Sequence, residues 1–290
     1  MTDPLLVAGL VLAGAVAHAS WNLVVKRAAV SGPAFVWLSV VATSLLLVPV
    51  AVVAVIVAPP PSWPEFGVAV LIAGGLHAGY FLTLQAGYRA GDVSVVYPLA
   101  RGSGPLLAVL LAIPLLGERP TLLGLLGAGA VVIGVVVIGL AGGRANWASA
   151  RAGVLWGLLV GVLIAAYTLW DARAVTVLAI SPILLHAGTN VVEAALLAPL
   201  AARRWDAVRT TLRDHWRGVL VVSALSPLAY LFILYALQLA PVAIVAPARE
   251  ISVVLVGLAG WLLFKEPHPA QRLAGAVIVL GGIALLAVAR

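Results

Sequence analysis

This sequence has no cysteine and few charged residues, and both features limit the class of protein that it can encode. The chain of 290 residues has no cysteine, which excludes disulfides and thiolate metal sites. Charged residues make up only 9%, far fewer than the rough quarter found in soluble globular proteins. Runs of about 20 apolar residues, the length that spans a bilayer, follow one another along the chain. The sequence therefore predicts an all-α integral membrane protein.

Motifs of catalysis and cofactor binding are missing as well. There is no glycine-rich phosphate loop, no zinc motif and no pair of aspartates placed for chemistry. The five histidines are scattered over different segments. We therefore expect no enzyme activity, no cofactor and no metal site. The formal charge of +7 lies mainly in loops, which favours the lipid bilayer over nucleic acid as a partner.

Ten apolar segments are separated mostly by proline, glycine or charge. They cover about 5–25, 34–57, 66–88, 93–116, 121–141, 152–172, 182–201, 218–238, 242–264 and 270–289. The first run is too long for a signal peptide and follows no basic residue, so it is kept as a transmembrane helix. Only the connection from Ala202 to Arg217 is longer than a short loop. Its arginines and tryptophans predict an amphipathic segment at the membrane surface.

Rare residues recur at one spacing in the two halves of the chain. The matched pairs are Arg101 with Arg249, Glu118 with Glu266, Gly127 with Gly275 and Gly134 with Gly282, each 148 positions apart. We infer two five-helix repeats, residues 1–143 and 144–290, within one membrane domain. Because five is odd, the second repeat enters the membrane from the opposite side. Secondary transporters use such inverted repeats and bind substrate between them near the midplane.

Arg101 and Arg249 each follow a proline inside an apolar segment. An arginine is costly in hydrocarbon, so two at matched places need a physical reason. The planar guanidinium fork suits carboxylate or phosphate. We predict that both arginines face a central cavity between the halves and hold the anionic group of a substrate. The alternative is a structural ion pair, for example Arg249 neutralised by Glu193 or Glu250.

The seventh segment carries a polar stripe that the first half lacks. His186, Asn190 and Glu193 are spaced by four and three and so share one face of a helix. Glu193 is a candidate carrier of a proton or cation during transport. With Glu250 these residues form a predicted coupling or polar network. The alternative is a structural hydrogen-bonded stripe, or a salt bridge from Glu193 to Arg249.

Further candidates for substrate contact are polar or aromatic residues on other segments. They are Trp21, Asn22, His77, Tyr80, Tyr97 and Tyr230, with Tyr167 and Trp170 as additional aromatic candidates. Packing and the aromatic belt at the membrane surface are the alternative roles. For Glu118 and Glu266, at segment ends, we expect a structural role. The paired glycines favour close approach of helices, inside the protein or in a homodimer.

The segment ends also carry a family resemblance. Leu116-Gly117-Glu118-Arg119-Pro120 and Phe264-Lys265-Glu266-Pro267 each precede a glycine-bearing helix. With the length, the five-plus-five repeat and the opening run from His18 to Lys26, the chain resembles the drug/metabolite transporter superfamily in its ten-helix EamA branch. The resemblance implies a multi-pass protein of the plasma (bacterial inner) membrane. Helices one to four and six to nine would surround a central cavity, with helices five and ten as outer supports.

The resemblance also implies a function. We expect a secondary active transporter, and specifically an exporter, of small metabolites such as amino acids or organic anions. It would act by alternating access, with protons as candidate coupling ions. One alternative is an importer of an organic anion such as a phosphonate or carboxylate. Another, of a different class, is a lipid flippase or lipid-modifying membrane protein.

Lysine and arginine are distributed unequally between the two sets of loops. With a cytoplasmic N-terminus, the inner side would hold three of them, Arg119, Arg173 and Arg290, and the outer side twelve. Cytoplasmic loops are enriched in these residues, so the count predicts that both termini lie outside. The family resemblance implies cytoplasmic termini, and both expectations are kept.

Overall fold

The computed structural model describes residues 3–28, 32–140, 147–264 and 268–289, and these residues are mainly helical. The helices are α1 (Pro4–Ala28), α2 (Pro33–Val57), α3 (Trp63–Ala90), α4 (Val93–Leu116), α5 (Leu122–Leu140), α6 (Trp147–Thr176), α7 (Pro182–Ala202), α8 (Trp205–Leu239), α9 (Val242–Ala248), α10 (Ile251–Phe264) and α11 (Pro269–Val288). In the described residues ten segments are long and apolar enough to cross a membrane, with α9 and most of α10 in one of them. The predicted all-α membrane fold with ten transmembrane helices is confirmed.

Prolines and caps mark where the helices begin. A proline occupies the first or second position of α2, α3, α7 and α11, where its missing N–H costs no helical hydrogen bond. Ser62 caps α3 by accepting a hydrogen bond from the backbone N–H of Glu65 at 3.4 Å. After α4, Gly117 takes a positive φ of 70°, which favours glycine and turns the chain toward α5. These signals lie close to the predicted segment boundaries.

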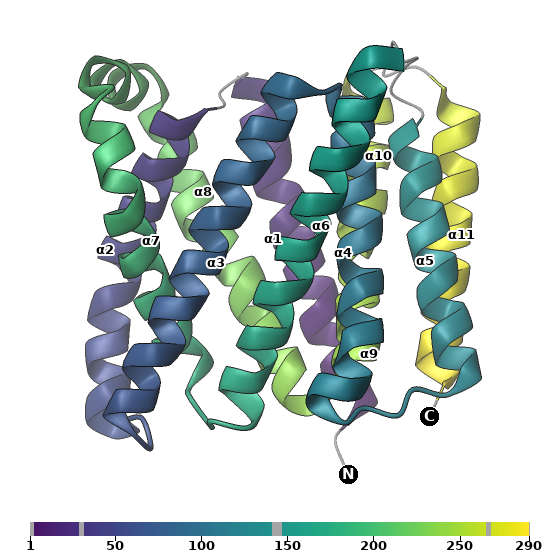
Figure 1. Ribbon diagram of the computed structural model, residues 1–290, viewed down its shortest axis with the longest axis horizontal. Coiled ribbons are helices and arrows are strands. Elements are labelled where there is room, and N and C mark those ends of the chain that lie inside the picture. The colour runs from purple at the N-terminus through teal and green to yellow at the C-terminus, as the bar shows by residue number, and fades with distance from the viewer. Residues whose placement is uncertain (1–2, 29–31, 141–146, 265–267, 290) are drawn as a thin grey trace.

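The two ends of the described chain lie on the same side of the helix bundle, as an even number of crossings requires (Figure 1). In the same view α1 rises from that side, whereas α6 descends toward it, so the first helices of the two halves run in opposite directions. Which side faces the cytoplasm stays a prediction. Glu266 and the predicted boundary between residues 143 and 144 lie outside the described residues.

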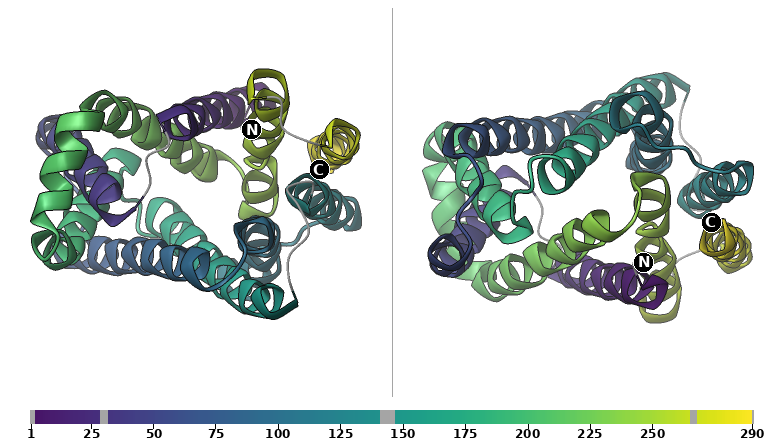
Figure 2. Two further views of the ribbon diagram at one scale, coloured as in Figure 1. Left: turned by 90° about the horizontal axis from the view of Figure 1, so that it is seen from above. Right: turned by 90° about the horizontal axis from the view of Figure 1, so that it is seen from below.

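The helices of the two halves pack against one another. From the first half α3 contacts α6 and α7, and from the second α8 contacts α1 and α2 in the corresponding way. The pairs α2 with α7 and α5 with α11 also join the halves. Views along the bundle show α5 and α11 side by side at one end, with the other helices arranged around a centre (Figure 2). The largest clusters of buried apolar residues therefore draw on both halves.

Glycines set the distance between α5 and α11. A Cβ at Gly134 would lie 2.7 Å from the carbonyl oxygen of Gly275, and a Cβ at Gly127 would lie 2.9 Å from that of Gly282. Only hydrogen fits at these crossings, which is how small residues let helices approach in membranes. These glycines therefore pack α5 against α11 within one chain. A homodimer stays a prediction, and it does not depend on these glycines.

The predicted amphipathic connection is largely helical. Helix α8 begins at Trp205 and bends at His215, where φ is −131° and ψ is 19°, before it continues as the eighth transmembrane helix. The Arg209 guanidinium lies 5.9 Å from the ring centre of Trp205, a cation–π arrangement on an exposed surface. The predicted eighth apolar segment, 218–238, begins just past this bend, and the polar first turns of α8 form the predicted amphipathic connection.

Candidate functional site

A cavity of about 430 Å³ lies at the centre of the bundle. Helices α1, α2, α3, α4, α6, α7 and α8 and the segment around Arg249 contribute to its wall, and among the described residues α5 and α11 contribute none. All eight residues predicted to contact substrate line it: Trp21, Asn22, His77, Tyr80, Tyr97, Arg101, Tyr230 and Arg249. The structure thus brings them together, and their role in binding stays a prediction.

The ninth transmembrane helix is broken at Arg249 and Glu250. Helix α9 ends at Ala248 and α10 begins at Ile251, so the two charged residues occupy a turn between them. Pro247 has no N–H to donate to the preceding turn, which helps to interrupt the helix. In α4, by contrast, the helix continues through Arg101. The sequence predicted a continuous ninth segment, and the break places Glu250 inside the protein with 1% of its surface exposed.

Glu250 lies between the two arginines. Its Oε2 is 3.1 Å from Nε of Arg101, and its Oε1 is 3.6 Å from Nε of Arg249. Arg101 comes from the first half and Arg249 from the second, so this carboxylate joins the halves. The alternative in which Glu250 neutralises Arg249 is therefore present in the structure, whereas an Arg249–Glu193 ion pair is not formed between these described residues.

The charges in this cluster are only partly satisfied. Both Nε atoms and both carboxylate oxygens lie at ion-pair distance, yet none has the alignment of a hydrogen bond. Arg101 Nη2 donates to Ser252 at 3.3 Å, and Arg249 Nη2 donates to Thr168 at 3.3 Å. Two guanidinium groups and one carboxylate leave a net charge of +1 beside the cavity. An anionic group could bind here with charge-assisted hydrogen bonds.

A second charged cluster joins α3, α6 and α8. Asp171 on α6 has 1% of its surface exposed, and its Oδ2 lies 3.0 Å from Nε2 of His77. The hydroxyl of Tyr230 donates to the same oxygen at 2.5 Å. The His77 ring also stacks on Tyr167, with ring centres 4.4 Å apart. Sequence reasoning selected His77 and Tyr230 but missed Asp171, whose signal was a single acidic residue at the end of an apolar run.

The polar stripe of α7 lies on the cavity wall, as the spacing of His186, Asn190 and Glu193 indicated. Asn190 Nδ2 donates to the backbone carbonyl of His186 at 2.8 Å, and the His186 ring centre is 5.2 Å from that of Tyr230. Within the described residues the Glu193 carboxylate forms neither a hydrogen bond nor an ion pair. The role of Glu193 in coupling stays a prediction.

Residues of α1 and α6 complete the aromatic wall. Asn22 Nδ2 donates to the carbonyl oxygen of His18 at 2.7 Å, and Trp21 Nε1 is buried without a hydrogen-bond partner. Tyr80 packs edge-on against Tyr167 with ring centres 5.6 Å apart. Trp170 does not join this wall, because its Nε1 donates to the carbonyl oxygen of Ala69 at 3.0 Å.

Glu118 has the structural position expected of it. Its two carboxylate oxygens accept hydrogen bonds from the backbone N–H groups of Val242 at 2.6 Å and Ala243 at 2.9 Å. These are N–H groups at the start of α9 that have no partner within the helix. A residue of the first half thereby holds the start of the helix that leads to Arg249.

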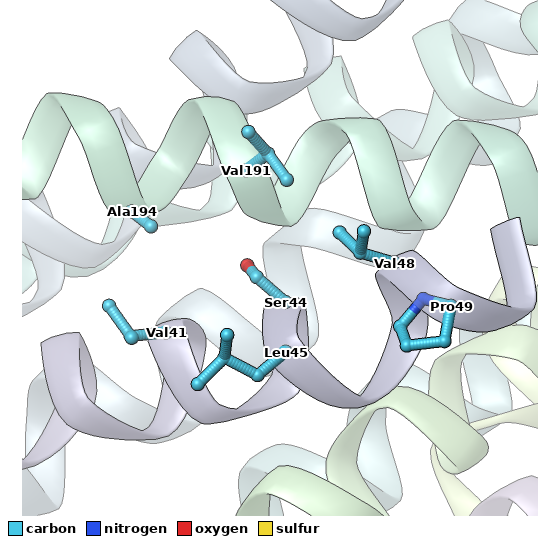
Figure 3. Close-up of a pocket in the computed structure, with 7 residues that line it drawn as sticks. All are labelled: Val41, Ser44, Leu45, Val48, Pro49, Val191 and Ala194. Atoms are coloured by element: carbon cyan, nitrogen blue, oxygen red, sulfur yellow. The ribbon is translucent and has the colours of Figure 1, made fainter. Parts of the chain in front are cut away.

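A shallow apolar groove lies between α2 and α7, and it shares no lining residue with the central cavity (Figure 3). Leu45, Val48 and Val191 are exposed along it, and Ser44 points toward α7. The Ser44 hydroxyl is already hydrogen-bonded to the carbonyl oxygen of Val40 at 2.9 Å. The groove therefore offers apolar contact but little polar chemistry.

Comparison with known sequences assigns the family. The sequence model of the EamA-like transporter family matches residues 5–140 and again residues 151–288. The chain belongs to the EamA-like transporter family. The resemblance drawn from the segment ends is confirmed, and the protein is a multi-pass membrane transporter.

Two individual proteins are also similar to this EamA-like chain. A probable 4-amino-4-deoxy-L-arabinose-phosphoundecaprenol flippase subunit, ArnE, of Pseudomonas fluorescens (strain Pf0-1) is 32% identical over 88 residues, which cover 30% of this chain and 77% of ArnE. A protein of known crystal structure superposes with a TM-score of 0.73 over 97% of this chain and 98% of its own, at 18% identity. The second likeness supports the fold alone.

Proposed function

We propose that this EamA-like transporter is a secondary active exporter of small metabolites that carry an anionic group, such as amino acids or organic anions. The observation that carries the proposal is the Arg101–Glu250–Arg249 cluster beside the central cavity. Each half of the chain supplies one arginine, and the net positive charge favours a carboxylate or phosphate. The aromatic wall would pack against the apolar part of the substrate.

We propose alternating access between two inverted repeats, residues 1–143 and 144–290, as the mode of transport. The family model matches once in each half, and α1 and α6 run in opposite directions. Packing between the halves supports the same proposal. Gly127 packs on Gly282, and the repeat mates of these two residues, Gly275 and Gly134, pack on each other.

In this mechanism the substrate anion competes with Glu250 for the guanidinium groups. Because Glu250 contacts an arginine from each half, an anion that replaces either contact would loosen one half from the other. The proposal includes coupling to protons, with the carboxylates of the cavity, Glu193 among them, as carriers.

Flux into liposomes tests the proposal. Purified protein is reconstituted and exchange is measured for a panel of amino acids, phosphonates and cations. We expect exchange of probes with a carboxylate or phosphonate, and at least a tenfold loss of it in Arg101→Gln, since a charged hydrogen bond contributes about 1.5–3 kcal/mol. Arg213→Gln is the control, because Arg213 is exposed and pairs with Asp214 at the surface. Equal exchange of neutral analogues, or full activity of Arg101→Gln, would contradict the proposal.

The direction of transport has one alternative, uptake of an organic anion such as a phosphonate or carboxylate. Accumulation inside liposomes of known protein orientation, under an imposed pH gradient, separates uptake from export. The proposed exporter moves the probe out of the compartment that corresponds to the cytoplasm, whereas an importer moves it in.

A lipid flippase is the second candidate function. The similarity to ArnE, which is named as a probable flippase subunit, favours it, and the exposed apolar groove between α2 and α7 offers a surface for an acyl chain. A lipid with a fluorescent headgroup, quenched from one side of the vesicle, reports its movement between leaflets. Movement that depends on the protein, together with no flux of the soluble probes, would favour the flippase.

A further inference from the structure

We propose that Asp171, His77 and Tyr230 form a proton-binding site, in which the carboxylate and the imidazole share one proton. Its use in coupling rests on the proposed transport function, whereas proton binding itself does not. The site differs from the stripe on α7, on which the sequence had placed the coupling residue. It is also separate from the Arg101–Glu250–Arg249 cluster.

The geometry of the carboxylate supports the proposal. Oδ2 of Asp171 receives the Tyr230 hydroxyl at 2.5 Å and lies 3.0 Å from Nε2 of His77. The other oxygen, Oδ1, is buried and has no hydrogen-bond partner. A buried carboxylate oxygen without a donor is costly while the group is charged. The site therefore has two places for a proton, the imidazole and the free carboxylate oxygen, within one hydrogen-bonded unit.

Charge balance supports the same assignment. Among the described residues, the charged side chains that line the cavity or pair with its wall are Arg101 and Arg249, which are positive, and Glu250, Asp171 and Glu193, which are negative. With neutral histidines the sum is −1, so one proton makes the cavity neutral. A net charge is costly inside a membrane, which favours binding of that proton. Imidazole is the side chain that ordinarily changes charge near neutral pH.

Several titratable groups face this site from the helices packed around it. They are Tyr167 on α6, Glu193 and His186 on α7, Arg249 between α9 and α10, and Arg101 on α4 across the cavity. Glu193, the carboxylate of this group, is the alternative candidate for carrying the proton. It differs from Asp171 in having no hydrogen-bonding partner in the described structure, so nothing holds it at a distance fixed for proton transfer.

The first experiment needs no substrate. Infrared difference spectra between acidic and alkaline pH are recorded on the full-length protein in lipid nanodiscs. All variants share the bands of the surface carboxylates and histidines, and on top of these we expect the wild type to show a buried carboxyl band and an imidazole signal that are missing from Asp171→Asn and kept in Glu193→Gln. Tyr230→Phe, which keeps the ring and removes the hydroxyl, should shift the frequency of this carboxyl band, because the Asp171 carboxylate loses a hydrogen-bond donor. Identical difference spectra of the wild type and Asp171→Asn, or a band that is unchanged in Tyr230→Phe, overturn the proposal.

The second experiment tests coupling with L-phenylalanine as the probe in liposomes. Exchange without a pH gradient and movement driven by a pH gradient are measured for the wild type and for Asp171→Asn, since Asp171 is not among the residues that line the cavity. We expect Asp171→Asn to keep exchange and to lose the response to the gradient, whereas a response that survives overturns the coupling. If wild-type protein moves no carboxylate or phosphonate probe of the panel while the infrared signals depend on Asp171, the substrate proposal fails and the proton site stands.

Discussion

Replacement of Glu250 by glutamine would remove the negative charge between Arg101 and Arg249 while keeping the side-chain volume. The oxygens of Glu250 lie 3.1 and 3.6 Å from the two Nε atoms. Two unit charges about 4 Å apart attract by about 4 kcal/mol at an effective dielectric constant of 20. Removal of one partner of a buried ion pair costs about 3–5 kcal/mol, because the remaining charge is left unpaired. We expect Glu250→Gln to lose stability by that amount.

Thermal unfolding in detergent measures this loss. A change of that size corresponds to a fall in Tm on the order of 10 °C. Millimolar formate should restore part of it, because the small carboxylate can take the place of the missing one. The matched control is Asp214→Asn, since Asp214 pairs with Arg213 at 2.7 Å but on an exposed surface, where ion pairs contribute little. A Tm that falls equally in both variants, or in neither, would refute the reasoning.

Three further predictions concern packing, capping and recognition. Gly134→Leu should lower the free energy of unfolding by about 1–3 kcal/mol, because the new leucine side chain would meet the α11 backbone. Gly129→Leu is the control, since there is open space around Gly129, and it should leave the free energy of unfolding unchanged. Chemical denaturation measures both variants. Glu118→Ala should cost about 1–2 kcal/mol by the same assay, since the start of α9 loses both its acceptors, and Glu65→Gln at an exposed position is the control. Arg101→Lys should weaken binding of a carboxylate probe about tenfold, because an ammonium cannot bind it through a planar fork, and should lower Tm less than Glu250→Gln does, because the positive charge is kept. Unchanged affinity would show that the fork is not used.

The transmembrane helices could be predicted because a bilayer requires long apolar runs. The predicted segment 34–57 corresponds to α2 at Pro33–Val57, and 182–201 to α7 at Pro182–Ala202. The break at Arg249 and Glu250 could not be predicted in the same way. Both residues stand in an apolar run that is long enough for one continuous helix, and the turn depends on the buried partners of Glu250.

Asp171 was missed for a related reason. The apolar run was predicted to end at residue 172, with Arg173 just beyond, so the aspartate had the pattern of a membrane-surface residue. Helix α6 continues to Thr176, and α3 and α8 cover Asp171. Its partners His77 and Tyr230 are 94 and 59 positions away in the chain. Helical periodicity cannot predict that residues so far apart in sequence are close in space.

For Arg101 and Arg249 the sequence pattern predicted part of the arrangement. Their matched spacing predicted a shared cavity, and both line it. The carboxylate between them, Glu250, was predicted as a candidate partner of Arg249 and as part of a coupling or polar network, but not as a partner of Arg101. That Arg101 also reaches Glu250 depends on how α4 docks against α9, which the sequence does not specify.

A crystal structure with bound 3-bromopropionate tests the central claim most directly, because bromine locates the probe by its anomalous signal. We predict a bromine peak in the central cavity, with the carboxylate within hydrogen-bonding distance of Arg101 and Arg249. A peak in the groove between α2 and α7 and none in the cavity, in a protein that still transports the probe, would contradict the account.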